Sequence, residues 1–262
     1  MKFLKVLLVS IYVIIIILLL LSLIKCEHKC SSDTPAVRCD TVVQEKDTIP
    51  QKVIIKEKFK ADVVMCIDCT GSMGSIINII KNNALTFYSD LKKRCISHGK
   101  EITSMRIKVI GFRDLEDSSP FEESIFYAIP KEKDVFCSFV SRLRPIGGGD
   151  GPERGYDALA MAMHSDWKED KDVHQIIILW TDEASHPLNG KFGGPGMEEL
   201  TTRWKNKMNQ KGKRLILFVP EVFSWNQLVE TWDKTTRHDV STGGGLSDVD
   251  YDDIINTLSE NI

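Results

Sequence analysis

Apolar positions along the chain follow two periodic patterns. Short apolar runs predict β-strands at residues 62–67, 106–112, 124–129, 175–180 and 214–219. Between these runs, apolar residues recur every three or four positions, which predicts helices at residues 76–91, 136–143, 154–164, 197–209, 226–236 and 249–261. Such alternation is typical of an α/β fold, in which a doubly wound, mostly parallel sheet carries helices on both faces.

One connection departs from this alternation. The segment between the second and third predicted strands, residues 113–123, is too short to contain a crossover helix. Parallel strands need such a crossover, whereas antiparallel strands do not. We therefore expect one antiparallel edge strand, formed by residues 124–129.

The amino-terminal segment has a membrane signal. An apolar run at residues 6–24 follows Lys2 and Lys5 and is long enough to span a bilayer as a helix. Residues 1–25 are interpreted as an uncleaved signal anchor, with a cleaved signal peptide and a lipoprotein signal ending at Cys26 as alternatives. No small-x-small cleavage site follows the run, and Lys25 stands where a lipoprotein signal has a small residue. Both observations favour the anchor.

The flanking charges give a weak bias toward a cytoplasmic amino terminus, which places the rest of the chain outside the cytoplasm. Residues 26–60 contain prolines, serines and many charges, and we interpret them as a stalk. Residues 61–262 then form the folded domain. The expected location is membrane-anchored and extracytoplasmic, with a secreted protein or a lipoprotein as the alternatives.

Composition narrows the function further. The net charge is -3, with 34 lysines and arginines against 37 aspartates and glutamates spread along the chain, so no basic stripe is available for phosphates. Nucleic acid is therefore excluded as the expected partner. The 7 cysteines are irregularly spaced and imply no disulfide framework. Cys66 and Cys69 are interpreted as small buried residues rather than as zinc or redox groups.

Candidate chemistry lies where the predicted strands end. Ligands of open parallel sheets bind beyond the carboxyl ends of the strands. Asp68 follows the first strand, and Thr181 and Asp182 follow the strand at 175–180. Thr70 and Ser72 alternate with Asp68, so in an extended stretch the three oxygens point the same way and converge on one ion.

These residues carry a resemblance to a known family. Asp68-x-Thr70-x-Ser72 is similar to the metal-ion-dependent adhesion site of von Willebrand factor type A (VWA) domains. Asp182 falls where that family has a later aspartate, and Gly147-Gly148-Gly149-Asp150 occupies the loop in which many members have a metal-binding threonine. The resemblance spans residues 61–262 and implies a VWA-like fold.

The resemblance also implies a site and a function. The metal ligands would be Asp68, Thr70, Ser72, Asp150 and Asp182. Oxygen ligands of this kind suit Mg²⁺, with Mn²⁺ or Ca²⁺ as alternatives. The family binds partner proteins through the metal, often by an acidic side chain of the partner. A third acid at position 150 would hold the cation more tightly but make it less attractive to a carboxylate.

Simpler interpretations of these residues stay open. Thr70 and Ser72 could cap the first helix, and Asp150 could belong to a glycine-rich turn. Glu153 is interpreted as a helix-start residue. Asp114 either supports the site or is a solvated loop residue, and His186 is interpreted as a loop residue because no second histidine is spaced to join it.

An enzyme and a structural subunit are the two alternatives to a metal-dependent binding module. A phosphatase with Asp68 as nucleophile would need a second aspartate two residues later as general acid, and Thr70 stands there instead. The glycines at 147–149 lack the lysine of a phosphate-binding loop. A metal-independent structural subunit of an envelope complex is the remaining alternative. The sequence thus predicts a membrane-tethered, metal-binding VWA module for protein–protein interaction, and not an enzyme.

Overall fold

A mostly parallel β-sheet lies at the centre of the protein. The computed structural model describes residues 54–114, 117, 119–149, 151–188 and 196–262. Within them the strand order is β3-β2-β1-β5-β6-β7, and β4 also pairs with β2. All pairings among β2, β1, β5, β6 and β7 are parallel, whereas β3 and β4 run antiparallel to β2. The strands are β1 Glu57–Asp68, β2 Lys100–Phe112, β3 Phe121–Glu123, β4 Tyr127–Ile129, β5 Val173–Trp180, β6 Lys213–Val219 and β7 Thr235–Asp239.

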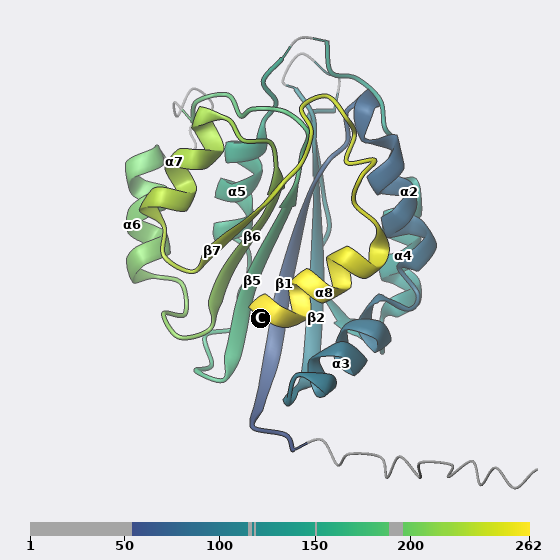
Figure 1. Ribbon diagram of the computed structural model, residues 1–262, viewed down its shortest axis with the longest axis vertical. Helices are drawn as coiled ribbons and strands as arrows, with labels where there is room; N and C mark the ends of the chain where they lie inside the picture. Colours follow the sequence, from purple (N-terminus) through teal and green to yellow (C-terminus); the bar gives the residue numbers. More distant parts are fainter. Residues whose placement is uncertain (1–53, 115–116, 118, 150, 189–195) are drawn as a thin grey trace, which may run out of the picture. The chain divides into compact units, whose positions relative to one another are not determined.

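Helices cover both faces of the sheet (Figure 1). Side chains of α2, α3, α4 and α8 form one apolar core with the sheet, and those of α5, α6 and α7 form a second core on the opposite face. The helices are η1 Gly71–Met73, α2 Gly74–Asn83, α3 Phe87–Ser97, α4 Lys133–Arg142, α5 Gly155–Met163, α6 Met197–Asn206, α7 Phe223–Thr231 and α8 Tyr251–Asn261. The mixed α/β architecture expected from the sequence is therefore confirmed.

The central strands are apolar on both faces because both faces are buried. In β5, Ile176, Ile178 and Trp180 pack in the first core. Ile177 and Leu179, which point the opposite way, pack in the second. A continuous apolar run is what a parallel strand between two helical layers requires.

The first predicted helix is interrupted. Instead of one helix over residues 76–91, α2 ends at Asn83 and α3 begins at Phe87. Thr86 N donates to Asn83 O at 3.1 Å, which closes a turn at the break. Asparagine and threonine compete for backbone hydrogen bonds and so disfavour helix interiors. Within α2, Ile76 is fully buried, whereas Ile80 is partly buried and packs against the core.

The two edges of the sheet differ from the prediction. The expected antiparallel edge is present, but β4 covers only Tyr127–Ile129 of the predicted strand at 124–129. A second short antiparallel strand, β3, lies before it in the predicted connection at 113–123, and between the two the Ser124 hydroxyl accepts a hydrogen bond from Val109 N at 2.9 Å. At the other edge, the predicted helix over 226–236 ends at Thr231, and Thr235–Asp239 forms β7. This strand is polar and partly exposed, so it lacks the apolar pattern of a strand.

The folded unit begins earlier than residue 61. Strand β1 starts at Glu57, and the compact unit comprises Gln51–Ile262. The predicted anchor at 1–25 and nearly all of the stalk at 26–60 lie outside the described residues. Within the described part of the chain, each helix is too short or too polar to cross a lipid bilayer.

Cys66 and Cys69 are small buried residues, as expected. Both are free thiols and neither is exposed to solvent. The Cys66 thiol donates to Ala158 O, and the Cys69 thiol to Ile67 O. Burial raises the pKa of Cys69 to about 12, which keeps this thiol protonated and unreactive.

Candidate metal centre

The two strands that end in candidate ligands are neighbours in the sheet. Ile67 of β1 is paired with Trp180 of β5, so the residues that follow them emerge side by side at the carboxyl edge. Thr181 Oγ1 donates to Asp68 Oδ2 at 2.6 Å. The parallel register therefore brings together two loops that are 113 residues apart in the sequence.

Asp68 is buried and oriented by hydrogen bonds. Its Oδ1 accepts from Thr70 N at 2.9 Å and from Thr70 Oγ1 at 2.7 Å. Burial raises the pKa of Asp68 to about 6, against the opposing effect of the hydrogen bonds from Thr181 and Thr70. The Thr70 side chain makes no capping hydrogen bond although Thr70 is the N-cap of η1. Its hydroxyl serves the carboxylate instead.

Ser72, which follows β1, is hydrogen-bonded to Asp182, which follows β5. Ser72 Oγ donates to Asp182 Oδ1 at 3.0 Å, and Gly245 N donates to Asp182 Oδ2 at 2.8 Å. Asp182 is fully buried, whereas Ser72 is exposed. The structure thus unites four of the five predicted ligands in two hydrogen-bonded pairs, Asp68 with Thr70 and Ser72 with Asp182. Asp150, the fifth, lies outside the described residues.

A glycine loop passes directly over these pairs. Gly71 N donates to Gly147 O at 3.1 Å, and Gly147 and Gly148 have φ angles of 80° and 73°. A Cβ atom on Gly148 would lie 2.9 Å from Thr70 Cβ and 3.0 Å from Glu153 Oε1. Only glycine combines this backbone conformation with so close an approach. Because Thr70 Cβ and Glu153 Oε1 both lie close to this one Cβ position, the Glu153 carboxylate lies beside Thr70.

Glu153 is a candidate ligand that the sequence interpretation missed. It precedes α5 and is not a residue of its first turn. Glu153 N donates to Ala184 O, which anchors Glu153 beside the loop that carries Asp182. Its side chain is 4% exposed, and its buried Oε2 has no hydrogen-bond partner within the described structure. In the sequence, its position directly after Asp150-Gly151-Pro152 was the available signal.

The surroundings of Glu153 are acidic. Burial, and then the nearby Asp68, Asp114 and Asp117 carboxylates, raise its pKa to about 8. A buried anion close to other anions is unfavourable unless a cation offsets them. The chemistry of this oxygen set therefore fits a hard divalent cation.

Asp114, another acid at this edge, faces basic side chains. Asp114 is buried, with its Oδ1 atom 3.6 Å from His186 Nε2 and 3.9 Å from Arg154 Nε. It is therefore not a solvated loop residue. His186, interpreted as a loop residue, forms part of this ion-pair group.

Arg113 connects the loops around the site. Its side chain is buried, and its Nε donates to Cys69 O at 3.2 Å and to Ile146 O at 3.1 Å. A further guanidinium nitrogen pairs with Glu122 at 2.7 Å. One cation thereby fixes the Asp68 loop against the glycine loop without neutralising the candidate ligands.

The candidate ligands border an open depression of about 310 Å³. Its lining is formed by Thr70, Gly71, Ser72, Gly147, Gly148, Gly149, Gly151, Glu153 and Glu183. Over the described residues, no group of three or more histidine, cysteine, aspartate and glutamate side chains is arranged to hold a metal ion. A cation here would accordingly depend on the hydroxyl groups of Thr70 and Ser72 in addition to carboxylates.

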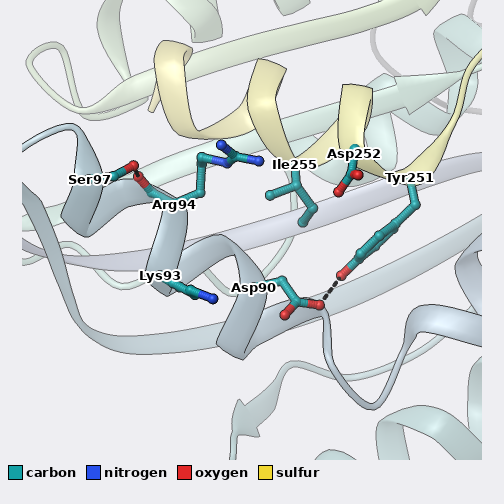
Figure 2. A pocket seen from close by; sticks show the side chains of 7 residues that line it. All are labelled: Asp90, Lys93, Arg94, Ser97, Tyr251, Asp252 and Ile255. Carbon is teal, nitrogen blue, oxygen red and sulfur yellow. Dashed lines mark hydrogen bonds between the residues drawn. The ribbon is translucent and has the colours of Figure 1, made fainter. Parts of the chain in front are cut away.

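A larger depression, of about 440 Å³, lies between α3 and α8 (Figure 2). There Tyr251 donates its hydroxyl hydrogen to Asp90 Oδ2 at 2.9 Å. Basic Lys93 and Arg94 and acidic Asp252 also border it, so both signs of charge are present. It contains none of the residues that the sequence singles out.

Comparisons with known proteins extend this description only to a limited degree. No family model matches the chain. The chain is 26% identical over 155 residues to the alpha-protein kinase vwkA of Dictyostelium discoideum, a match that covers 56% of the chain and 23% of that protein. The chain thus spans less than a quarter of the length of this curated relative.

Solved structures with similar architecture come from pili and from a mussel thread. The pilus adhesin SpaC of Lactobacillus rhamnosus GG has a TM-score of 0.45 at 11% identity, with 78% of this chain and 30% of that chain covered. The PilB minor pilin of Streptococcus sanguinis has a TM-score of 0.48 at 13% identity, with 78% and 62% covered. Proximal thread matrix protein 1 of the mussel byssus has a TM-score of 0.45 at 14% identity, with 78% and 48% covered. At these identities and coverages, the comparisons do not assign the chain to a family.

Proposed function

We propose that residues 54–262 form a VWA-type module that holds a divalent cation and binds another protein through it. The observation that carries this proposal is the convergence of two hydrogen-bonded pairs, Asp68 with Thr70 and Ser72 with Asp182, beside the unpartnered oxygen of Glu153. Buried carboxylates are gathered there although they repel one another. A bound cation supplies the reason for such an arrangement.

The ligand set determines which ions fit. Asp68, Thr70, Ser72 and Asp182 offer carboxylate and hydroxyl oxygens, and Asp150 belongs to the proposed set by its place in the sequence. Oxygen ligands of this type suit Mg²⁺, Mn²⁺ or Ca²⁺. Glu153 would act as a further ligand or accept a hydrogen bond from a metal-bound water.

The partner is proposed to reach the cation through the open depression. Mg²⁺ prefers six oxygen ligands, and a bound ion at this edge keeps positions that face solvent. Water or an acidic side chain of another protein would fill them. Additional acids in the site strengthen cation binding and weaken the attraction of the ion for a partner's carboxylate.

We infer binding rather than catalysis. An aspartyl nucleophile at Asp68 would need a general acid close by. The side chain two residues later is Thr70, whose hydroxyl is donated to Asp68 itself. An Mg²⁺-dependent phosphoryl-transfer or hydrolytic reaction would therefore require a group from elsewhere.

The apolar run at residues 6–24 supports a membrane tether, with the module on the extracytoplasmic side. Extraction of membranes at alkaline pH tests the tether, because an anchored chain stays in the pellet. Protease added to intact cells tests the orientation. Release by alkali, or protection from external protease, would contradict this part of the proposal.

Metal binding is tested by calorimetric titration of Mn²⁺ into the full chain in detergent. The unmodified protein should bind Mn²⁺ and gain thermal stability by mass action, about 2.7 kcal/mol when the ion is at 100 times its Kd. Asp68→Ala and Asp182→Ala should abolish both effects, and Asp150→Thr should weaken binding in a folded protein. Asp170→Ala, an exposed aspartate, is the matched control. Equal melting temperatures in EDTA and in millimolar Mn²⁺ would contradict the proposal.

A further inference from the structure

The depression over the candidate metal centre is negatively charged even when a cation is counted. Glu153 and Glu183 line it. Asp68 and Asp182 are buried, and each is hydrogen-bonded to a residue of the lining, Asp68 to Thr70 and Asp182 to Ser72. With a divalent ion bound and all four carboxylates ionised around it, four negative charges against two positive ones would leave an excess of two.

Nearby cations do not remove this excess. The Arg113 guanidinium binds backbone carbonyls and Glu122, and Arg154 faces Asp114 and Asp157. Lys81 Nζ donates to Leu143 O at 2.6 Å. These cations are directed toward the supporting structure and not into the depression.

Glu183 is the acid best placed to meet a partner. It lines the depression and is partly exposed, unlike the buried Asp68 and Asp182. Its carboxylate forms no ion pair with a lysine, arginine or histidine among the residues that the structure describes. Its backbone is held firmly, because Trp225 Nε1 donates to Glu183 O at 2.9 Å and Glu183 N donates to Thr181 Oγ1 at 3.2 Å.

A second observation points to a ligand in this acidic region rather than to a merely solvated surface. Glu153 Oε2 is buried without a hydrogen-bond partner, and Glu153 lines the same depression. A cation beside Glu153 accounts for that oxygen but not for Glu183, which lies nearer to solvent. The Glu183 carboxylate is therefore available to pair with a positive charge that comes from elsewhere.

We propose that the protein partner places a lysine or arginine side chain against Glu183, next to the group that it presents to the metal. This inference rests on the proposed function, since the metal brings the partner to the depression. The basic side chain offsets the excess negative charge that makes binding of an acid alone unfavourable. The preferred motif is then an acidic residue beside a basic one.

Two short peptides test this pairing. Fluorescein-labelled Gly-Asp-Lys-Gly and Gly-Asp-norleucine-Gly, both amidated, differ only by the ammonium group of the lysine. Their affinities for the full chain are measured by fluorescence anisotropy at saturating Mn²⁺. The lysine peptide should bind about fivefold more tightly, as expected for a partly exposed ion pair.

Substitution of Glu183 isolates the contact. Glu183→Gln should remove the preference for lysine. Because one acid fewer then lies near the ion, Mn²⁺ should bind somewhat more weakly, and the norleucine peptide somewhat more tightly, than in the unmodified protein. Glu221→Gln is the matched control, because Glu221 is an exposed acid that follows β6 and pairs with Arg237. That variant should keep the preference.

The outcomes separate the two proposals. If the unmodified protein does not bind Mn²⁺ in calorimetry, the metal-dependent function fails. If Mn²⁺ binds but the two peptides bind equally, or if neither binds at millimolar concentration, the basic partner residue is wrong while the metal site stands. Retention of the lysine preference in Glu183→Gln would also overturn the assignment.

Discussion

Thr181 Oγ1 lies 2.6 Å from Asp68 Oδ2, and this hydrogen bond joins the ends of two neighbouring parallel strands. Thr181 is fully buried, so its hydroxyl hydrogen has no competition from solvent. Asp68 is thereby held in one orientation before any cation binds. Orientation of a ligand in advance reduces the entropy that metal binding must overcome.

Thr181→Val should therefore lower both the stability and the Mn²⁺ affinity of the protein. Valine has nearly the same shape but leaves a buried carboxylate oxygen without its donor, at a cost of about 1–3 kcal/mol. Urea unfolding in EDTA measures the first effect, and calorimetry with Mn²⁺ the second.

Thr235→Val is the control for this substitution. Thr235 Oγ1 is buried without a hydrogen-bond partner in the described structure, so loss of its hydroxyl should leave stability unchanged or slightly higher. If both variants lose equal stability, the Thr181–Asp68 hydrogen bond has no special part in the site.

Glu153→Gln should separate metal binding from folding. Burial and the nearby Asp68 raise the pKa of Glu153 to about 8 and so favour its neutral form when no cation is present. The neutral glutamine variant should therefore unfold in EDTA at the same temperature as the unmodified protein or higher. Its Mn²⁺ affinity should fall by at least about tenfold, the size of effect typical of residues around a metal. Unchanged Mn²⁺ affinity would exclude Glu153 from the site and return it to the helix-start interpretation.

Much of the sheet was predictable because its central strands are buried on both faces. Residues 62–67, 106–112, 175–180 and 214–219 are mostly apolar, and each lies within a strand of the structure. The edge strands were harder to predict. Strand β7 is polar and partly exposed, and β3 and β4 are only three residues long each, too short for a clear alternation of apolar and polar positions.

The candidate site was predictable where strand order alone positions it. Asp68 and Asp182 each follow an apolar strand, and parallel pairing brings such strand ends to one edge. Glu153 was not predictable in the same way, because its inward direction depends on the hydrogen bond from Glu153 N to Ala184 O between two loops. No periodic pattern in the sequence encodes a loop-to-loop contact.

Ile76→Asp should unfold the domain. Ile76 of α2 is fully buried in the core on one face of the sheet, where an aspartate would be an unpaired buried charge. We expect a loss of more than about 4 kcal/mol, which most domains cannot tolerate. Circular dichroism during thermal unfolding measures this loss.

Phe223→Asp is the matched control for Ile76. Phe223 begins α7 and is 82% exposed, so a charge there meets water, and the variant should melt cooperatively near the temperature of the unmodified protein. A soluble Ile76→Asp protein with a cooperative transition would show that this face of α2 does not pack as described.

The last prediction concerns pH. His174 of β5 stacks on Phe59 with ring centroids 4.2 Å apart, and burial lowers the pKa of His174 below its ordinary value of 6.5, against the opposing effect of Glu57. Between the lowered pKa and 6.5 the unfolded chain binds the proton more readily than the folded one. Unfolding then takes up protons, so the free energy of unfolding rises with pH through this window and levels off above it. The glutamine side chain of His174→Gln cannot titrate, so the difference in unfolding free energy between the two proteins should change with pH below 6.5 and level off above it. Urea unfolding in EDTA measures the free energy of unfolding of each protein across this pH range. Because both proteins contain the same acids at the metal centre, the contribution of these acids cancels in the difference. His98→Gln, at an exposed histidine, is the matched control. A pH-independent difference for His174→Gln would show that the ring is as accessible to protons in the folded protein as in the unfolded chain.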